Sequence, residues 1–554
     1  MDDTVFIKAF RRLSQGSKQS VQSGKELDDF DKYMHIDRPI DRAVREAMDS
    51  IRIEGGGILV LVGSAGDGKS HMISTLKKEY SDFEFRNDAS ESPWPNVESI
   101  DALKIFLKDF EDATLHTTTS KMLVAINMGR LSAFIDDVAV QTNFGEIVRC
   151  CKTLFDEDNL RHDETERVRI VSFANHQIFE LFPEQKCEYP IDSLFIKQVL
   201  DKITSKAYDN VFRKAFINST PIGSDFDPCY INYQLLSIPA IQDSIVKIII
   251  EAIIRFKLLL TPRELFDFIY RIVVPDCYAT FNPSKDFFRS LLPNILFAGG
   301  ENKILKCLAI LDPLKHGSID HNDYLSELFT SIEIPDEPCF NYLKGKLHER
   351  FFTIMDEYYK NNRSNVEDIS KLLFRMRHLL EYHSESDEYR SFLGILCGYY
   401  DNDEDRLFPL YETIQRSIPH FYGSYTDKPN VVPLDIQGRE FKMFVSCDNL
   451  KPDPQDSIPF DKNNRNKFVV EIDTQWKVNT PVSLKIEYQL YEYLCKIQCG
   501  KLAQADDRNH NLSFCEFISN LVRQTDFKEK VIILTSDNQQ LTLSRTFGKK
   551  VTLK

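Results

Sequence analysis

GGGILVLVGSAGDGKS, residues 55–70, is the stretch that decides the fold. Its apolar run 58–62, preceded by glycines, is typical of a buried strand in a parallel sheet. The octet 63–70 fills every fixed position of the pattern G-x-x-x-x-G-K-[ST], and the segment KSHMISTLKKEY (69–80) has the composition of a helix. Strand, glycine-rich loop and helix in this order predict a loop that holds phosphate groups at a helix N-terminus.

The fixed positions of the loop have separate roles. Gly63 and Gly68 allow the backbone to curl, so that successive N–H groups point at a β-phosphate. Lys69 reaches the β- and γ-phosphate oxygens, and the Ser70 hydroxyl is a ligand for Mg²⁺. We therefore expect ATP and Mg²⁺ to bind here; the alternative is a glycine-rich turn that holds no ligand. The residues predicted to contact the nucleotide are Gly63, Ser64, Ala65, Gly66, Asp67, Gly68, Lys69, Ser70 and His71. The last of these is expected chiefly to pack on the helix.

The segments after the loop alternate between strand and helix patterns. FEFRND (83–88), KMLVAIN (121–127) and RVRIVSFAN (167–175) have strand composition, and IDALKIFLKDFEDA (100–113) has helix composition. This alternation predicts an α/β core of the P-loop NTPase type, AAA+ or STAND-like, with helices on both faces of a parallel sheet.

Beyond this sheet the chain changes character twice. Its pattern is mostly helical from 190 to about 420, and composition that favours strands begins after Gly423, with two helical pieces at 483–499 and 512–524. The chain is too long for one core. The predicted parts are an N-terminal helical segment (1–50), the P-loop NTPase core (51–190), a helical lid and extension (191–424) and a C-terminal strand-rich α+β domain (425–554).

Charge and cysteine content narrow the class of protein. The 554 residues carry 69 Lys and Arg against 84 Asp and Glu, which does not suit a general nucleic-acid binder. Residues 431–554, with 18 bases and 16 acids, are the part least repellent to DNA. The twelve cysteines contain no C-x-x-C pair, which favours reduced thiols over zinc. The most apolar stretch, 245–260, contains four charged residues, so we expect a core helix, no membrane contact and a cytoplasmic protein.

The residues that would complete the chemistry follow a less regular pattern. A hydrolysing ring-type ATPase commonly ends a strand with an Asp-Glu pair, whereas the two strands here end in Asn127 and Asn175. An amide can bind a γ-phosphate or position water, although it is a poor base. Asp88, after the second strand, is the candidate for assisting Mg²⁺. The alternative for all three is an ordinary cap at a strand end.

Arg263 is the candidate for sensing the γ-phosphate from the lid. It lies just inside a helix that Thr261 would cap and Pro262 would open. The alternative is an arginine that faces solvent or pairs with an acid.

Several of these motifs together resemble those of the DptF family. They are YMHIDRPID (33–41), GSAGDGKSH (63–71), FRNDASES (85–92), AINMGRL (125–131) and LLTPRELFDFIY (259–270). The likeness is strongest over 33–175 and extends to about 320. DptF proteins are ATPase-like subunits of bacterial restriction systems that depend on DNA phosphorothioation.

The resemblance implies a role in a larger complex. Such subunits act with DptG-like and DptH-like proteins, the latter helicase-like, against DNA that lacks the sulfur-for-oxygen modification of the backbone. By position it implies a nucleotide site at Gly63, Gly68, Lys69 and Ser70, with Asn87, Asp88 and Asn127 as further candidates. The sequence shows no nuclease motif, so we do not expect this chain itself to cut DNA.

Other functions stay open. The missing Asp-Glu pair favours a nucleotide-gated scaffold or sensor with little turnover, and a signalling NTPase with a lid and a recognition domain is also compatible. A small-molecule kinase is the least suitable, because the long remainder of the chain has no second phosphate-handling motif. Residues 425–554 are predicted to dock a partner protein or DNA; the alternative is that they only pack against the lid.

Overall fold

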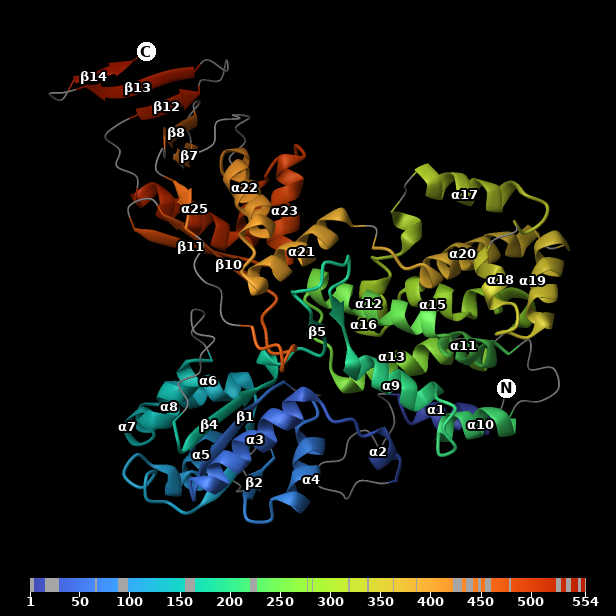
Figure 1. Ribbon diagram of the computed structural model, residues 1–554, viewed down its shortest axis with the longest axis horizontal. Helices are drawn as coiled ribbons and strands as arrows, with labels where there is room; N and C mark the ends of the chain where they lie inside the picture. Colours follow the sequence, from blue (N-terminus) through green and yellow to red (C-terminus); the bar gives the residue numbers. More distant parts are fainter. Residues whose placement is uncertain are drawn as a thin grey trace.

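The fold is that of a computed structural model of the 554-residue chain. The residues it describes are 4–14, 29–64, 67–87, 98–154, 165–219, 227–276, 278–280, 282–316, 319–335, 338–361, 363–384, 386–421, 431–434, 442–446, 450–453, 460–477, 480–524, 530–534, 540–546 and 550–553. Figure 1 shows an α/β core, a helical region beside it, and a C-terminal region that ends in a projecting sheet.

The α/β core is built on a four-stranded sheet with the strand order β2-β3-β1-β4. All three pairings are parallel. β1 (Gly57–Val62) lies between β3 (Lys121–Ile126) and β4 (Val168–Ser172), and β2 (Glu84–Arg86) is an edge strand. Every residue of β1 is buried, as its uninterrupted apolar run requires. These observations confirm the predicted α/β core with a parallel sheet.

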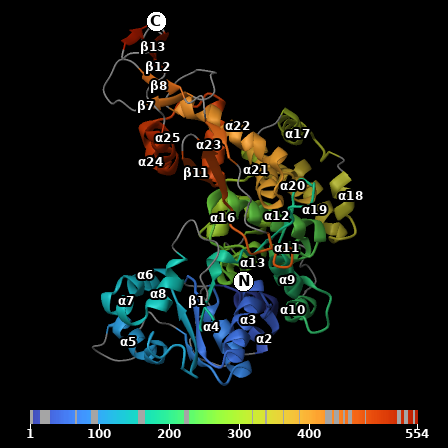
Figure 2. The same cartoon turned by 60° about the vertical axis from the view of Figure 1, so that its left-hand side comes forward.

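Helices cover both faces of this sheet, because alternate strand residues point to opposite sides (Figures 1 and 2). Leu59 and Leu61 of β1 pack against α3 and α4, whereas Ile58 and Val60 pack against the helices of the other face. The first face carries α3 (Pro39–Ile53) and α4 (Lys69–Glu79). The second carries α5 (Ser99–Phe106), η1 (Lys108–Phe110), α6 (Met128–Asp136), α7 (Val138–Asn143) and α8 (Gly145–Lys152). The helix expected at 100–113 is therefore shorter than predicted.

The N-terminal residues divide between two parts of the molecule. α1 (Val5–Arg11) and α2 (Asp29–Met34) pack on the helical region, where the Phe6 ring stacks on that of Tyr230 at a centroid distance of 5.1 Å. α3, which begins at Pro39, packs on the sheet instead. The segment between α2 and α3 therefore crosses from the helical region to the α/β core.

After β4, η2 (Phe173–Asn175) and the hairpin of β5 (Glu180–Leu181) and β6 (Ile191–Asp192) lead into the helical region. Its helices are α9 (Leu194–Thr204), α10 (Val211–Ser219), α11 (Pro228–Leu236), α12 (Pro239–Phe256), α13 (Pro262–Val273), η4 (Tyr278–Thr280), α14 (Pro283–Asp286), η5 (Phe288–Ser290), α15 (Leu292–Ala298), α16 (Lys303–Leu308), η6 (Pro313–Lys315), α17 (Ile319–Thr330), α18 (Pro338–Leu343), α19 (Glu349–Asn361), α20 (Arg363–Leu380), α21 (Asp387–Asp401) and α22 (Glu404–Phe421).

The predicted core helix at 245–260 is α12, which is buried along much of its length. It ends at Phe256 because Lys257 takes a left-handed backbone conformation, with φ of 51°. Within the described residues, no helix combines the length and the apolarity needed to cross a bilayer.

The C-terminal region combines helices with two antiparallel sheets. The first sheet has the order β11-β10-β9 and the second the order β14-β13-β12-β8-β7. The strands are β7 (Val431–Leu434), β8 (Lys442–Ser446), β9 (Lys451–Pro452), β10 (Ile472–Lys477), β11 (Pro481–Ile486), β12 (Lys530–Leu534), β13 (Gln540–Thr546) and β14 (Lys550–Leu553). The helices are α23 (Tyr488–Gln498), α24 (Ala505–His510) and α25 (Leu512–Gln524). The mixed α and β composition is as predicted, and α25 confirms the helix expected at 512–524.

The helix expected at 483–499 is wrong in its first part. Val482, Leu484 and Ile486 alternate as buried side chains of β11, which pairs with β10. Burial with a period of two residues belongs to a strand, and the helix begins only at Tyr488.

The first of these sheets shares an apolar core with the helical region. The Trp476 ring on β10 is fully buried and contacts the ring of Tyr411 on α22 at a centroid distance of 5.1 Å. It also contacts the ring of Phe517 on α25, at a centroid distance of 5.9 Å. Residues 472–524 therefore pack as an extension of the helical region, whereas β12 to β14 project beyond it (Figure 1).

Candidate phosphate-binding site

The octet 63–70 lies where β1 ends and α4 begins, as the sequence predicts. The Gly63 N–H donates to the carbonyl of Ile126 on β3 at 3.1 Å. A Cβ atom at Gly63 would stand 2.6 Å from the Phe173 ring and 2.7 Å from the Asp67 carboxylate. Gly68 caps α4 in a left-handed conformation, with φ of 85°. Both fixed glycines are thus demanded by the geometry. Ala65 and Gly66 lie outside the described residues.

Two side chains hold the described part of the loop together. The Lys69 amine donates to the carbonyl oxygen of Gly63 at 2.8 Å and to that of Ser64 at 2.5 Å. The Asp67 carboxylate accepts the Ser64 N–H. The Lys69 charge therefore lies against the first two residues of the loop, beside the N-terminus of α4, where backbone N–H groups and the helix dipole favour an anion.

Asp67 adds a carboxylate to this loop. Burial raises its pKa, although the Ser64 N–H and the nearby charges of Lys69 and Arg38 oppose the shift. Glu264, at the start of α13, raises the pKa further. The beginning of α13 therefore lies within electrostatic range of the loop.

Ser70 and His71 occupy the first turn of α4, and both are partly exposed. His71 Nε2 lies 2.9 Å from His35 Nδ1, and His35 Nε2 lies 3.3 Å from the Asp37 carboxylate. His71 thus packs on the segment that precedes α3.

The two asparagines expected at strand ends lie after the strands that flank β1. Val62 pairs with Ile126 of β3 on one side and with Ser172 of β4 on the other. Asn127 follows β3, and its Oδ1 accepts the N–H of Arg130 at 2.9 Å as the cap of α6. Asn175 ends the turn after β4 and is partly exposed. Both residues follow the carboxyl ends of strands that flank β1, on the same side of the sheet as the loop. Asn127 acts as a cap, which was the alternative to a catalytic role.

Asp88, the candidate for assisting Mg²⁺, lies outside the described residues. The strand before it is β2, and β3 lies between β2 and β1. The distance from β2 to β1 is therefore two strand spacings, or about 10 Å. Asn87, also a candidate, is described: its Oδ1 is buried and receives no hydrogen bond. The described residues contain no group of three or more His, Cys, Asp and Glu arranged to hold a metal ion.

Arg263 lies in the first turn of α13 and is exposed. The predicted start of this helix is confirmed: Thr261 is the cap, Pro262 is in the first turn, and Thr261 and Glu264 form a reciprocal capping box. Glu264 also pairs with Lys303 at 2.8 Å. The capping box fixes the end of α13 that approaches Asp67.

Sequence reasoning missed the residues that reach the loop from the segment before α3. Arg38 Nη1 donates to the Asp67 carbonyl at 2.6 Å, and its guanidinium carbon lies 5.3 Å from the centre of the Phe173 ring. The available signal was the arginine in YMHIDRPID (33–41), but its position in the sequence does not by itself indicate contact with the loop. Its contact joins residues 29 positions apart in the chain.

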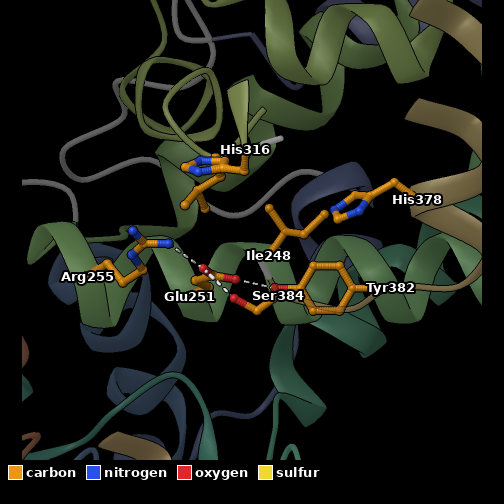
Figure 3. Close-up of a pocket in the computed structure, with 8 residues that line it drawn as sticks. Ile248, Glu251, Arg255, His316, His378, Tyr382 and Ser384 are labelled. Atoms are coloured by element: carbon orange, nitrogen blue, oxygen red, sulfur yellow. Dashed lines mark hydrogen bonds and ion pairs between the residues drawn. The ribbon is translucent and has the colours of Figure 1, made fainter. Parts of the chain in front are cut away.

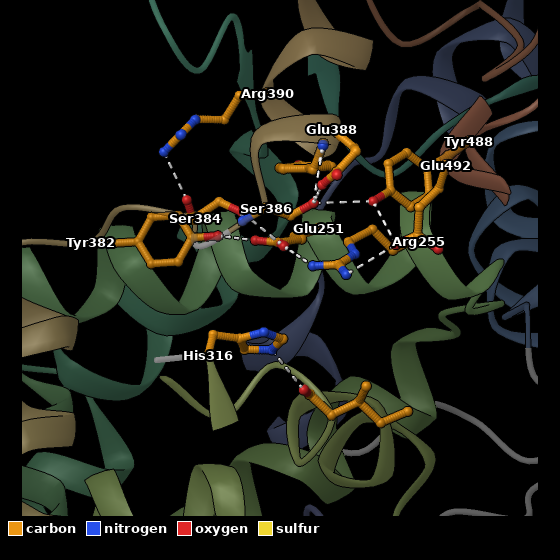
Figure 4. A network of polar contacts seen from close by, with 12 residues as sticks. Glu251, Arg255, His316, Tyr382, Ser384, Ser386, Glu388, Arg390, Tyr488 and Glu492 are labelled. Carbon is orange, nitrogen blue, oxygen red and sulfur yellow. Dashed lines mark hydrogen bonds and ion pairs between the residues drawn. The ribbon is translucent and has the colours of Figure 1, made fainter. Parts of the chain in front are cut away.

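A second concentration of polar side chains lies in the helical region (Figures 3 and 4). Glu251 of α12, almost fully buried, accepts hydrogen bonds from Arg255 at 2.8 Å, from Ser384 at 2.9 Å and from the Tyr382 hydroxyl. Arg255 also reaches Glu492 of α23 at 3.5 Å. The adjoining cavity has room for about one water molecule. We interpret this cluster as a junction between elements and not as a ligand site.

Comparison with known proteins gives no relative: no family model, no curated protein and no solved structure matches the chain.

Proposed function

We propose that the protein binds ATP with Mg²⁺ on the loop 63–70. The observation that carries the proposal is the passage from β1 through this loop into α4, with the Lys69 amine held against the Gly63 and Ser64 carbonyls. Lys69 would move its charge from these carbonyls to the β- and γ-phosphates, and the Ser70 hydroxyl would be the ligand for Mg²⁺. The P-loop NTPase assignment, of AAA+ or STAND type, belongs to the same proposal.

The wider role we propose is that of a DptF-like subunit in a phosphorothioation-dependent restriction complex in the bacterial cytoplasm. It rests on the sequence resemblance over 33–175. ATP binding, with or without hydrolysis, would then gate the action of DptG-like and DptH-like partners on unmodified DNA. We place the contact with these partners or with DNA in residues 425–554.

A second candidate is a nucleotide-gated scaffold or signalling NTPase with little turnover. The capping bond of Asn127 favours it, because an amide oxygen committed to the Arg130 N–H is poorly placed to orient a water molecule. Arg263 would then report the γ-phosphate to α13 without assisting its cleavage.

The nucleotide proposal is tested by calorimetry with ATP·Mg²⁺ on three proteins. Lys69→Ala removes a charged contact to phosphate and no core volume, so we expect affinity to fall by about a hundredfold or more while the fold is kept. Lys77→Ala, an exposed lysine on the same helix, is the matched control and should bind like wild type. Equal binding by Lys69→Ala and wild type would show that the loop is not the nucleotide site.

Turnover and partners separate the remaining functions. A restriction ATPase should hydrolyse ATP faster with DNA and co-purify with a helicase-like protein. A scaffold should bind ATP with negligible turnover under both conditions. A signalling NTPase should bind ATP but co-purify with no helicase-like protein.

A further inference from the structure

Arg38 reaches the phosphate loop from outside it with a charged side chain that is largely buried. It lies just before α3, and its side chain is 12% exposed. Nη1 donates to the Asp67 carbonyl at 2.6 Å, Nε donates to the Asp41 carboxylate at 3.2 Å, and the guanidinium faces the Phe173 ring. These three contacts fix both the position and the plane of the guanidinium.

The bond to the Asp67 carbonyl has a consequence for the next residue. In a trans peptide the C=O of one residue and the N–H of the next point in opposite directions. The peptide bonds of the described residues are all trans. Because Arg38 binds the Asp67 carbonyl, the Gly68 N–H points away from Arg38, and no described residue accepts it.

The backbone conformation of Gly68 and the space around it both suit the contact with Arg38. Its φ of 85° is a conformation that side chains disfavour, and a Cβ atom there would stand 3.4 Å from the Arg38 guanidinium nitrogens. The glycine therefore serves the turn into α4 and also the close approach of Arg38. The next bond along the chain is already helical, from the Met72 N–H to the Gly68 carbonyl at 3.0 Å.

The segment that carries Arg38 is anchored at both ends. On the helical region, Met34 is buried and the Tyr33 hydroxyl donates to the Lys202 carbonyl of α9 at 2.5 Å. On the α/β core, Asp41 of α3 also accepts the Arg38 N–H at 2.7 Å. Arg38 is thus held by the segment that joins the two parts of the molecule.

We propose that Arg38 is a positioning residue of the nucleotide site: it does not touch the nucleotide, but fixes the Asp67–Gly68 peptide so that the Gly68 N–H faces the phosphates. The inference rests on the proposed function, since it assigns a task within the same site. It also makes affinity for nucleotide depend on the segment 35–38 and hence on how the helical region sits against the core.

The experiment measures ATP·Mg²⁺ affinity by calorimetry for wild type, Lys69→Ala, Arg38→Gln, Arg38→Lys and Arg45→Gln, with the unfolding midpoint of each protein without nucleotide. Arg38→Gln loses the charged bond to the Asp67 carbonyl and should weaken binding about tenfold. Arg38→Lys keeps one donor for that carbonyl and should recover most of the affinity, staying about threefold weaker than wild type. Arg45→Gln breaks surface ion pairs with Asp37 and Glu79 beside the same segment and should bind like wild type.

The outcomes are distinct. If wild type binds, Lys69→Ala does not, and both Arg38 variants bind like wild type, the inference is overturned and the proposed function stands. If wild type does not bind ATP·Mg²⁺, both are overturned. Equal weakening in Arg38→Lys and Arg38→Gln points to packing of the guanidinium alone and also overturns the inference. If Arg38→Gln lowers the unfolding midpoint by more than a few degrees, Arg38→Lys is the deciding variant. Affinity about threefold below wild type then supports the inference, and wild-type affinity overturns it.

Discussion

The Asp67 carboxylate, when ionised, carries a negative charge within the loop that is proposed to hold phosphates. It accepts the Ser64 N–H and stands close to Gly63, and burial raises its pKa. The ionised form opposes a bound phosphate, because two negative charges a few ångströms apart in a partly buried site repel by about 1 kcal/mol or more. The loop therefore combines an anchoring contact with an electrostatic cost to nucleotide binding.

Replacing Asp67 by Asn should tighten nucleotide binding. The Asn side chain keeps an oxygen for the Ser64 N–H and removes the charge, so we expect ATP·Mg²⁺ affinity at pH 8 to rise about fivefold. The pKa of Asp67 lies above its ordinary value, so the difference from wild type is complete above that raised pKa and is lost as pH falls through it. Calorimetry at pH 8 and at successively lower pH values, down to the acid limit of the folded protein, checks both the size of the difference and its loss. Asp136→Asn, the same charge change at an exposed site on α6, is the control. Unchanged affinity in Asp67→Asn at pH 8 would contradict the argument.

At the scale of elements, local patterns were reliable where one residue pattern decides the structure. The loop 63–70, the strand before it and the start of α13 at Thr261 follow from spacing and capping chemistry alone. The segment 483–499 failed because Leu484 and Ile486 also suit a helix, and only pairing with β10 selects the strand. Arg38 was missed because its contact with the loop depends on how the segment before α3 crosses between two parts of the fold.

The cap of α13 should matter for stability. Thr261→Ala removes the side-chain acceptor for the Glu264 N–H and leaves that donor without its cap, which costs about 1 kcal/mol. We expect a lower midpoint in thermal or chemical unfolding, with no loss of core volume. Thr142→Ala is the control, because that threonine lies exposed within α7 and bonds back to the Val138 carbonyl instead of capping a helix. A midpoint for Thr261→Ala that equals both wild type and the control would show that the capping box contributes nothing.

At the scale of the whole molecule, the C-terminal region has two unlike halves. Residues 472–524 are part of the large core through Trp476, whereas the outer strands of the second sheet carry exposed apolar side chains, with Val551 at 63% and Leu553 at 60% exposure. The packing of the first half could not be foreseen from composition, because burial of Trp476 depends on Tyr411 and Phe517 from distant helices. The inner half shares the apolar core of the helical region. We therefore expect the docking role, which stays a prediction, to belong to the outer sheet.

Removal of residues 525–554 tests this division. The deletion takes away β12, β13 and β14 and leaves the core around Trp476 in place, so we expect wild-type ATP·Mg²⁺ affinity and an unfolding midpoint within a few degrees of wild type. Co-purification with a DptH-like partner should be lost. A cut at residue 424 is a poor substitute, because it strips the partners of Tyr411 and exposes apolar core.

The same deletion distinguishes a protein partner from DNA. If the outer sheet binds DNA, full-length protein should bind a duplex with an affinity that falls steeply with added salt, by about 0.9 log units per tenfold salt for each phosphate contact, and the 1–524 protein should lose that binding. If the outer sheet binds a protein, DNA binding should be absent from, or equal in, the full-length and 1–524 proteins. Only co-purification with the partner should then differ between them. A 1–524 protein that keeps both the partner and the salt-dependent DNA binding would place the docking surface elsewhere, and the exposed Val551 and Leu553 would then be no more than the rim of an open sheet.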